Sequence, residues 1–303
     1  MTAKNTMTPT SAMTPTSAMT ARIISAVPVP FTADGSLDLP TYDAALAALA
    51  PHVGGALVAG TTGEFPALDD DERVELFRRA ADQLGADRVI AHLGHGSTRQ
   101  VLRLADAVAA AGIRRFALLS PYYLPTDDDG VVEFFRALTA AHPEAAVYAY
   151  LFPERTGMDV SPATLARILA LPGMIGVKLS GGAAARLTEY AAVLGPDHEL
   201  YSGDDSTLPT VLASGGTGVV SGVSSAFPET FAALARALDA GSPEAAELQA
   251  VVQELVPLVG PSIPRLKAAM SARDGAAWAS RMALPAVDAA TLEAIHAAVT
   301  AHR

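Results

Sequence analysis

The chain has 303 residues, half of them hydrophobic and 17% charged, and its 32 acidic against 21 basic side chains give a net charge of −11. The apolar content excludes a mainly disordered protein, and the negative charge argues against general binding to nucleic acid or to an anionic membrane, so small-molecule partners are favoured. The chain has no cysteine, which is compatible with a cytoplasmic location, and no apolar run long enough for a membrane helix.

Residues 1–21 differ in composition from the rest of the chain. They repeat the sequence MTPTSA, at Met7–Ala12 and again at Met13–Ala18, and lack the apolar core of a signal peptide. Low complexity of this kind predicts a disordered tail. Because Met19 and two earlier methionines could each be the true start, we interpret the tail as a start-site artefact in preference to a functional arm.

From residue 22 onward, short apolar or β-branched runs alternate with Ala- and Leu-rich stretches of helical spacing. Eight runs are predicted as strands: Ile23–Val27, Ala56–Ala59, Val89–Leu93, Phe116–Leu119, Ala146–Leu151, Ile175–Leu179, Glu199–Tyr201 and Gly218–Ser221. A helix fits in nearly every gap, as parallel βαβ units require. Eight such units close into a (β/α)8 TIM barrel, which we predict over residues 22–241.

A doubly wound open sheet is the alternative architecture. Its glycine-rich dinucleotide-binding motif would follow the first strand, where this chain has Val27–Pro30 instead, so we favour the barrel. Helical periodicity continues after the eighth strand, over Glu229–Ala240, Pro243–Leu258 and Pro264–Met270. Residues 242–303 are therefore predicted to form a C-terminal helical segment.

Barrel enzymes carry their chemistry at the carboxyl ends of the strands. After the second strand, Gly60–Glu64 has the sequence GTTGE, whose glycines let backbone N–H groups face an anion; an ordinary turn with a threonine helix cap is the alternative. The fifth strand ends near Tyr150, and Arg155, a residue type that binds carboxylates through two hydrogen bonds, follows five residues later. Together these features predict a site for a small acidic molecule.

Lys178 in the sixth strand is the strongest candidate for a catalytic residue. Strict alternation places the branched side chains of Ile175, Val177 and Leu179 against the outer helices, and so places Met174 and Lys178 in the barrel interior. An ammonium held there away from water is costly, which favours the neutral amine. A neutral amine attacks carbonyl groups, so the position predicts Schiff-base chemistry.

Only three of the basic residues are lysines, at positions 4, 178 and 267. A structural role for Lys178 would need a buried acidic partner, for which Asp204 and Asp205 after the seventh strand are candidates. Lys267 is predicted to be a solvated or interface residue at the start of a late helix.

Other polar clusters favour structural interpretations. Asp69–Glu72 and Thr126–Asp129 are predicted to be helix starts, where acids cap free N–H groups, and no histidine accompanies them to make a metal site. His92 and His95 lack a third metal ligand at suitable spacing.

Six segments together resemble the dihydrodipicolinate synthase / N-acetylneuraminate lyase family of pyruvate-dependent class I aldolases. They are Gly60–Glu64, Pro121–Tyr123, Tyr150–Gly157, Gly176–Lys178, Ser202–Asp205 and Gly215–Ser221, and each lies at or beside a predicted strand end. The resemblance extends from residue 22 to the C-terminus. It implies a (β/α)8 barrel with a C-terminal helical segment, usually assembled as a homotetramer of tight dimers, that works without metal or cofactor.

The resemblance also implies catalytic roles. Lys178 would form the imine with the keto carbon of pyruvate or a related 2-oxo acid, and Tyr150 would transfer protons as a general acid and base. Thr61 and Tyr123 would complete the proton relay, with Tyr123 reaching across the tight-dimer interface.

Binding roles follow from the same resemblance. Thr62, with its backbone N–H, would hold the pyruvate carboxylate, and the main-chain carbonyl groups of Gly203 and Val220 would line the pocket. Arg155 would lie at the entrance and bind a carboxylate on the second substrate, an aldehyde or a sugar acid.

The chain departs from the family pattern at three positions. Leu151 replaces an asparagine that usually follows the strand-five tyrosine, Leu179 replaces an acidic residue common in synthases, and Glu154 occupies a small-residue position. These changes leave the imine-forming residues intact but are expected to alter the polarity around them, which leaves the second substrate open.

The chain also differs where lysine-inhibited synthases bind their effector. It has Phe65, Arg73, Gly96 and Gln100 there, so we predict no inhibition by lysine.

Three functions stay open. The first is a Schiff-base lyase or synthase that joins or splits pyruvate and an aldehyde, with 4-hydroxy-tetrahydrodipicolinate synthase as the leading single case. The second is a 2-keto-3-deoxy sugar acid aldolase or dehydratase that uses the same imine, which Phe65 and Leu151 favour. The third is a non-catalytic 2-oxo acid sensor, against which the joint presence of Lys178, Tyr150 and Arg155 argues.

Overall fold

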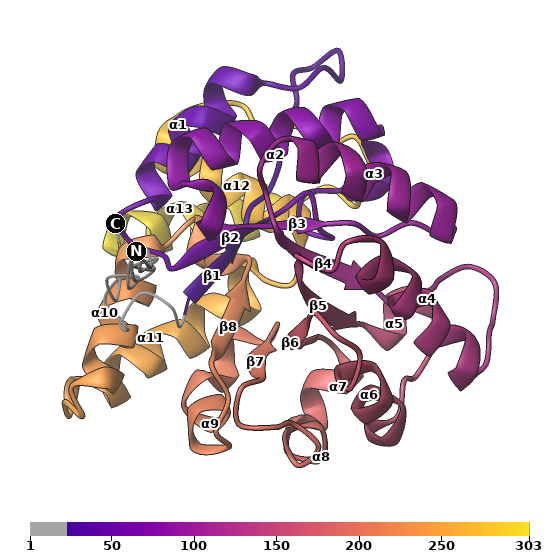
Figure 1. The fold of residues 1–303 in the computed structure, drawn as a ribbon. Helices are drawn as coiled ribbons and strands as arrows, with labels where there is room; N and C mark the ends of the chain where they lie inside the picture. The colour runs from indigo at the N-terminus through magenta and orange to yellow at the C-terminus, as the bar shows by residue number, and fades with distance from the viewer. Residues whose placement is uncertain (1–22, 303) are drawn as a thin grey trace, which may run out of the picture.

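The computed structural model describes residues 23–302, so the predicted tail over residues 1–21 lies outside the described residues. Eight parallel strands form a closed barrel in sequence order, and β1 pairs with β8 to close it (Figure 1). The strands are β1 (Ile23–Ala26), β2 (Gly55–Val58), β3 (Val89–His92), β4 (Arg115–Leu119), β5 (Ala146–Leu151), β6 (Met174–Leu179), β7 (Glu199–Ser202) and β8 (Gly218–Ser221). The predicted TIM barrel is therefore confirmed.

Helices surround the strands (Figure 1). The helices that belong to the eight strand–helix repeats of the barrel are α1 (Leu39–Leu49), α2 (Asp70–Leu84), α3 (Thr98–Ala110), α4 (Asp128–Ala141), α5 (Pro153–Thr156), α6 (Pro162–Leu169), α7 (Gly182–Ala185), α8 (Leu187–Ala191), α9 (Leu208–Ala213) and α10 (Pro228–Asp239). After them come α11 (Glu244–Val259), α12 (Ile263–Asp274) and α13 (Ala289–Ala301), which pack on one another. The C-terminal helical segment is therefore confirmed, although no periodic stretch had been identified at α13 itself. No helix within residues 23–302 is long and apolar enough to cross a membrane.

The two acidic clusters begin helices, as predicted. The Asp69 carboxylate accepts the backbone N–H of Glu72 at 2.8 Å, and the Glu72 carboxylate accepts that of Asp69 at 3.1 Å, which is a capping box at the start of α2. Asp127 caps α4 by accepting the backbone N–H of Gly130 at 2.8 Å. These acids satisfy free helix N–H groups and need no metal to explain them.

The core has two layers. The larger lies between the outer face of the strands and the helices, and the smaller fills the barrel with side chains that include Ile24, Leu57 and Ile90. At the amino-terminal end of the barrel, the Tyr148 hydroxyl donates to Glu199 at 2.5 Å. Because side chains fill this lower part of the barrel, the polar groups that a ligand could reach lie at the carboxyl ends of the strands.

One detail of β6 differs from the prediction. The register shifts opposite Val147 and Tyr148, and as a result Ile175 packs against the interior cluster while Met174 joins the outer core. A bulge of this kind breaks strict alternation by one residue. It lies before Lys178, so alternation resumes and Lys178 still points into the upper barrel, as predicted.

Candidate active site

Lys178 and Tyr150 face each other from adjacent strands. They are paired in register on β6 and β5, and the Lys178 Nζ lies 4.1 Å from the centre of the Tyr150 ring. Both side chains are buried, Lys178 with 7% of its surface exposed and Tyr150 with 1%. No carboxylate among residues 23–302 forms an ion pair with Lys178. The structure therefore does not support the alternative in which Lys178 has a structural role as the partner of a buried acid. A buried amine beside a phenol, without an ion-paired carboxylate among residues 23–302, suits carbonyl chemistry.

The two acids predicted as possible partners have other surroundings. Asp204 accepts the backbone N–H and the hydroxyl of Ser206, at 3.0 and 2.6 Å. Asp205 is buried, and this burial raises the pKa of its carboxyl from 3.8 to about 7, although hydrogen bonds from Ser221 and Val223 oppose the rise. The positive charge of Lys178 also lowers that pKa, but by less than burial raises it.

The GTTGE loop, residues Gly60–Glu64, brings two threonines to the same end of the barrel. The Thr61 hydroxyl lies 3.3 Å from the Tyr150 hydroxyl, which completes a Thr61–Tyr150–Lys178 chain. Backbone hydrogen bonds fold the loop tightly, with the N–H groups of Gly63 and Phe65 both donating to the Gly60 carbonyl.

Thr62 lies on the other side of the same loop, next to β8. A Cβ placed on Gly222 would be 3.6 Å from the Thr62 hydroxyl oxygen, which shows how closely the two loops approach. Val220 is buried in the barrel two residues earlier, while Gly203 after β7 is exposed and donates its N–H to Leu179 at 2.7 Å. The predicted binding residues thus come from the ends of β2, β7 and β8.

Arg155 lies on α5, just after β5. Its side chain is exposed, with the guanidinium carbon 5.5 Å from the centre of the Phe152 ring. The neighbouring Glu154 accepts the backbone N–H of Gly182 at 2.7 Å, and so joins the loop after β5 to the loop after β6. Arg155 is therefore exposed at the rim, while the Glu154 carboxylate has a backbone partner.

Tyr123 is the one predicted catalytic residue that the single chain does not bring to the others. It has a left-handed backbone with φ of 78° and is 91% exposed. The structure records no hydrogen bond between its hydroxyl and any residue in 23–302. Its neighbour Tyr122 instead turns inward and packs edge-on against Phe65, with ring centres 6.1 Å apart.

Two residues pack beside Tyr150 that were not predicted to contact it, although Phe65 was already considered for substrate preference and for the effector. Phe65 packs with Tyr150 in a small buried cluster, and His92 lies 4.6 Å from Phe65 and 5.9 Å from Tyr150 between ring centres. Burial, together with the charges of Arg73 and Lys178, holds the pKa of His92 well below its usual range, so its imidazole is neutral. His92 was considered only as a metal ligand, although its position at the end of β3 was a usable signal. Within residues 23–302, no three potential ligands gather to hold a metal ion.

Three sequence expectations about neighbouring residues are wrong. Leu151 and Leu179 pack in the outer core, so they do not change the polarity around Lys178 as expected. Lys267 is not solvated: it is 2% exposed, and its Nζ lies 2.5 Å from a carboxylate oxygen of Glu64. The partner of Lys267 is thus the last residue of the GTTGE loop.

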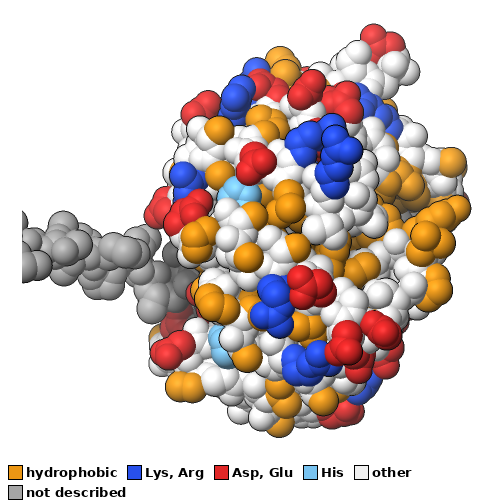
Figure 2. Space-filling view, turned by 45° about the vertical axis from the view of Figure 1, so that its right-hand side comes forward, with side chains coloured by type: hydrophobic (Ala, Val, Ile, Leu, Met, Phe, Trp, Pro, Cys, Tyr) orange, Lys and Arg blue, Asp and Glu red, His pale blue; other side chains and the backbone are white. Residues whose placement is uncertain are grey.

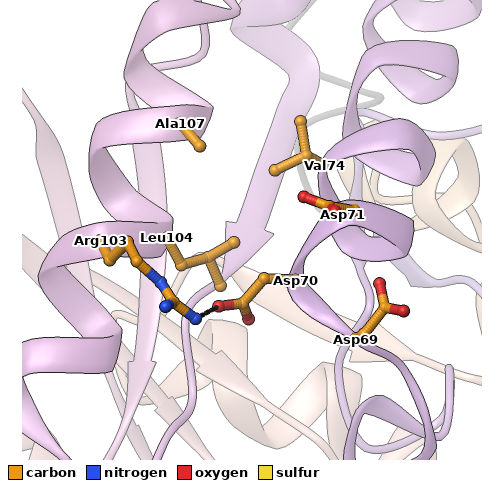
Figure 3. Close-up of a pocket in the computed structure, with 7 residues that line it drawn as sticks. All are labelled: Asp69, Asp70, Asp71, Val74, Arg103, Leu104 and Ala107. Carbon is orange, nitrogen blue, oxygen red and sulfur yellow. Dashed lines mark hydrogen bonds and ion pairs between the residues drawn. The ribbon is translucent and has the colours of Figure 1, made fainter.

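A surface pocket of about 480 Å³ lies elsewhere, between α2 and α3. It is lined by Asp69, Asp70, Asp71, Val74, Arg103, Leu104 and Ala107, and an Asp70–Arg103 ion pair of 2.8 Å crosses it (Figure 3). None of the residues around Lys178 lines it. On the face seen in Figure 2, the acidic and basic side chains of the described residues are interspersed, with no continuous basic surface that would suit nucleic acid.

The chain is similar in sequence and in fold to known proteins. The sequence model of the dihydrodipicolinate synthetase family matches residues 19–301. A 4-hydroxy-tetrahydrodipicolinate synthase from Cyanothece is 32% identical over 279 residues, covering 90% of this chain and 94% of that protein. Another, from Moorella thermoacetica, is 36% identical over 240 residues, covering 78% and 81%. The crystal structure of dihydrodipicolinate synthase from Cyanidioschyzon merolae with lysine bound superposes with a TM-score of 0.84 at 27% identity, covering 94% of this chain and 98% of that one.

A closed (β/α)8 barrel with polar side chains at the carboxyl ends of its strands is the architecture of a barrel enzyme. The chain belongs to the dihydrodipicolinate synthetase family, whose members are class I lyases and aldolases.

Proposed function

We propose that this protein is a Schiff-base lyase that joins pyruvate to an aldehyde, with the 4-hydroxy-tetrahydrodipicolinate synthase reaction as the leading case. The observation that carries the proposal is the chain of contacts from Lys178 to the Tyr150 ring at 4.1 Å and from the Tyr150 hydroxyl to that of Thr61 at 3.3 Å. It supplies a buried amine and a hydroxyl relay next to it.

The reaction proceeds in balanced steps. The Lys178 amine adds to the keto carbon of pyruvate, and Tyr150 protonates the departing hydroxyl so that water leaves and an imine forms. Loss of a methyl proton gives the enamine, whose terminal carbon attacks the aldehyde carbon. The aldehyde oxygen takes up a proton, and water then releases the product and restores the amine. No external cofactor enters these steps.

Binding groups surround this centre. Thr62 and its backbone N–H hold the carboxylate of pyruvate, and the main-chain carbonyl groups of Gly203 and Val220 line the pocket. Arg155, exposed at the rim, binds a carboxylate on the second substrate.

The oligomer is part of the proposal. Because Tyr123 is 91% exposed in one chain, it serves the relay of a second copy across a tight dimer, and two dimers form the homotetramer. A cytoplasmic location, with which the lack of cysteine is compatible, belongs to the same proposal.

A second candidate is a 2-keto-3-deoxy sugar acid aldolase or dehydratase that uses the same imine. The contact between Phe65 and Tyr150 favours it, because Phe65 gives this side of the site an apolar surface. An aldehyde that carries an amino group would be bound better by a polar side chain. A sensor without catalysis fits less well, because a sensor has no need of the Thr61–Tyr150 relay.

Initial rates with a small substrate panel test these candidates. Pyruvate is combined with aspartate semialdehyde, which bears a carboxylate, or with neutral glyceraldehyde, and 2-keto-3-deoxygluconate is tested alone. We expect the acidic aldehyde to give the highest kcat/KM. Arg155→Ala should lower that value about tenfold or more by removing a charge-assisted hydrogen bond, and should leave the neutral aldehyde unaffected.

Arg167→Ala provides the control, because Arg167 is exposed on α6 and pairs with Asp129. Faster turnover of the deoxygluconate would favour the second candidate. Pyruvate binding without turnover of any substrate would favour the sensor.

A further inference from the structure

The carboxylate of Glu64 is completely enclosed, although Glu64 is the last residue of the loop that carries Thr61 and Thr62. Its side chain has no exposed surface, and that of Lys267 on α12 is 2% exposed. The Lys267 Nζ donates to Glu64 Oε1 at 2.5 Å and to the Ala279 carbonyl oxygen at 2.7 Å. The pair joins two segments that lie 203 residues apart in the sequence.

The second carboxylate oxygen of Glu64 is also held by the C-terminal segment. Oε2 accepts the backbone N–H of Arg281 at 3.0 Å and that of Met282 at 2.7 Å. The Lys267 ammonium further lies 4.6 Å from the centre of the Phe31 ring. Both oxygens of Glu64 are thus fixed by donors from α12 and from the stretch that follows it.

The backbone on either side of the two threonines is in a conformation that ordinary residues avoid. Ala59 has φ of 48° and Glu64 has φ of 57°, both left-handed, and together they bracket the loop. Such conformations persist only where the surroundings impose them. For Glu64, those surroundings are the three donors from the C-terminal segment.

The same helix reaches the other side of the loop. A Cβ placed on Gly222 would lie 3.5 Å from the Leu266 side chain and 3.6 Å from the Thr62 hydroxyl oxygen, so Leu266 and Thr62 converge on this glycine. Lys267 is the next residue after Leu266 in α12. The helix therefore contacts the surroundings of Thr62 on one side and holds Glu64 on the other.

Stability alone is a weak reason for such a pair. Replacing a buried ion pair by well-packed apolar groups is often neutral or stabilising, because both charges must be removed from water. A pair with directional hydrogen bonds does, however, define the position of the loop more sharply than apolar packing.

We propose that Glu64 and Lys267 are positioning residues: their ion pair holds the GTTGE loop so that Thr62 can bind the carboxylate of the 2-oxo acid. The C-terminal helical segment thereby sets the affinity for pyruvate, although no part of it supplies a catalytic residue. This inference rests on the proposed function only in taking pyruvate as the ligand of the loop.

The test compares the KM for pyruvate with the KM for the aldehyde in Glu64→Gln and Lys267→Met. We expect each variant to raise the KM for pyruvate about tenfold, the effect of a displaced charge-assisted hydrogen bond, and to leave the KM for the aldehyde within about twofold. A purely structural role would only reduce the folded fraction, and hence the apparent kcat, with both KM values unchanged. That second outcome would overturn the proposal.

Two further variants distinguish a positioning role from a general loss of folding. Glu64→Asp keeps the charge but shortens the side chain, so a folded protein with a raised KM for pyruvate is expected, and an unchanged KM there would overturn the proposal by itself. Glu229→Gln is the matched control, because it breaks a two-point ion pair between the same helix α12, through Arg273, and α10, away from the loop. Its KM for pyruvate should equal that of the wild type.

Borohydride reduction in the presence of pyruvate separates this inference from the proposed function. If the wild type forms no adduct on Lys178, the proposed function fails whatever the variants do. If the wild type forms the adduct and the Glu64 and Lys267 variants form it at the same pyruvate concentrations, the positioning role alone fails.

Discussion

The amine of Lys178 lies 4.1 Å from the centre of the Tyr150 ring, and the two residues are direct partners in the pairing of β5 with β6. The distance between the two side chains is therefore determined by the backbone pairing of two adjacent barrel strands and does not depend on loops. The Tyr150 hydroxyl in turn lies 3.3 Å from Thr61, which gives the phenol a route for its proton.

Tyr150→Phe removes the hydroxyl and leaves the ring in place. We expect kcat to fall about a hundredfold or more, because a general acid and base is lost, while the melting temperature changes little. Stopped-flow or initial-rate assays measure the change, and Tyr148→Phe at the plugged end of the barrel is the comparison. A kcat within a few-fold of the wild type would show that another group transfers the protons.

Mixing two inactive variants tests whether Tyr123 acts across a dimer. A Tyr123→Phe chain keeps Lys178, and a Lys178→Met chain keeps Tyr123, so a mixed dimer would regain one complete site. We expect activity after mixing and subunit exchange to exceed the sum of the separate variants. No gain, with exchange verified by mass spectrometry, would place Tyr123 outside the relay.

Burial of Asp205 predicts a specific pH dependence of stability. Its folded pKa is about 7 against 3.8 for an ordinary carboxyl. Between these two values the folded protein keeps a proton that the unfolded chain has released, so the stabilisation from this group is complete below pH 3.8 and is lost as the pH rises to 7, by at most about 4 kcal/mol.

Asp205→Asn should remove that dependence. We expect the melting temperature of the wild type, relative to that of the variant, to fall as the pH rises from acidic toward neutral. Calorimetry across this range measures the difference, and parallel curves for the two proteins would show that Asp205 titrates normally.

Lysine should not inhibit the enzyme. At the positions considered for the effector, Phe65 is buried and the Arg73 guanidinium lies 5.7 Å from its ring centre. Arg73 also donates to the backbone carbonyl oxygens of His92 and Gly94, so a cation already fills this place and a second one would be repelled. Initial rates at rising lysine concentration measure the effect, and a curve that saturates at millimolar lysine or below would contradict it.

Much of the fold could be predicted because each strand is a compact apolar run with a turn at its end. The predicted strand Ala146–Leu151 coincides with β5, and Gly218–Ser221 coincides with β8. The bulge in β6 could not be predicted, since it arises from pairing with β5 and leaves no mark in the sequence around Ile175. The bounds of α13, within the predicted C-terminal helical segment, were not identified because its alanine-rich sequence has little contrast between its faces.

The site was predictable to the extent that its residues follow strand ends. Lys178, Tyr150 and Thr61 could be assigned to one rim, and the fold brings them together. Lys267 was misjudged because its partner, Glu64, is 203 residues away and only the folded chain joins them. Tyr123 points to solvent in a single chain, so the relay role predicted for it would require a second copy.

The most direct test of the whole account is borohydride reduction with pyruvate, followed by peptide mass mapping. The account predicts a reduced pyruvate adduct on Lys178 in the wild type and none in Lys178→Met. An active enzyme with no adduct on Lys178, or with the adduct on Lys267 instead, would contradict it.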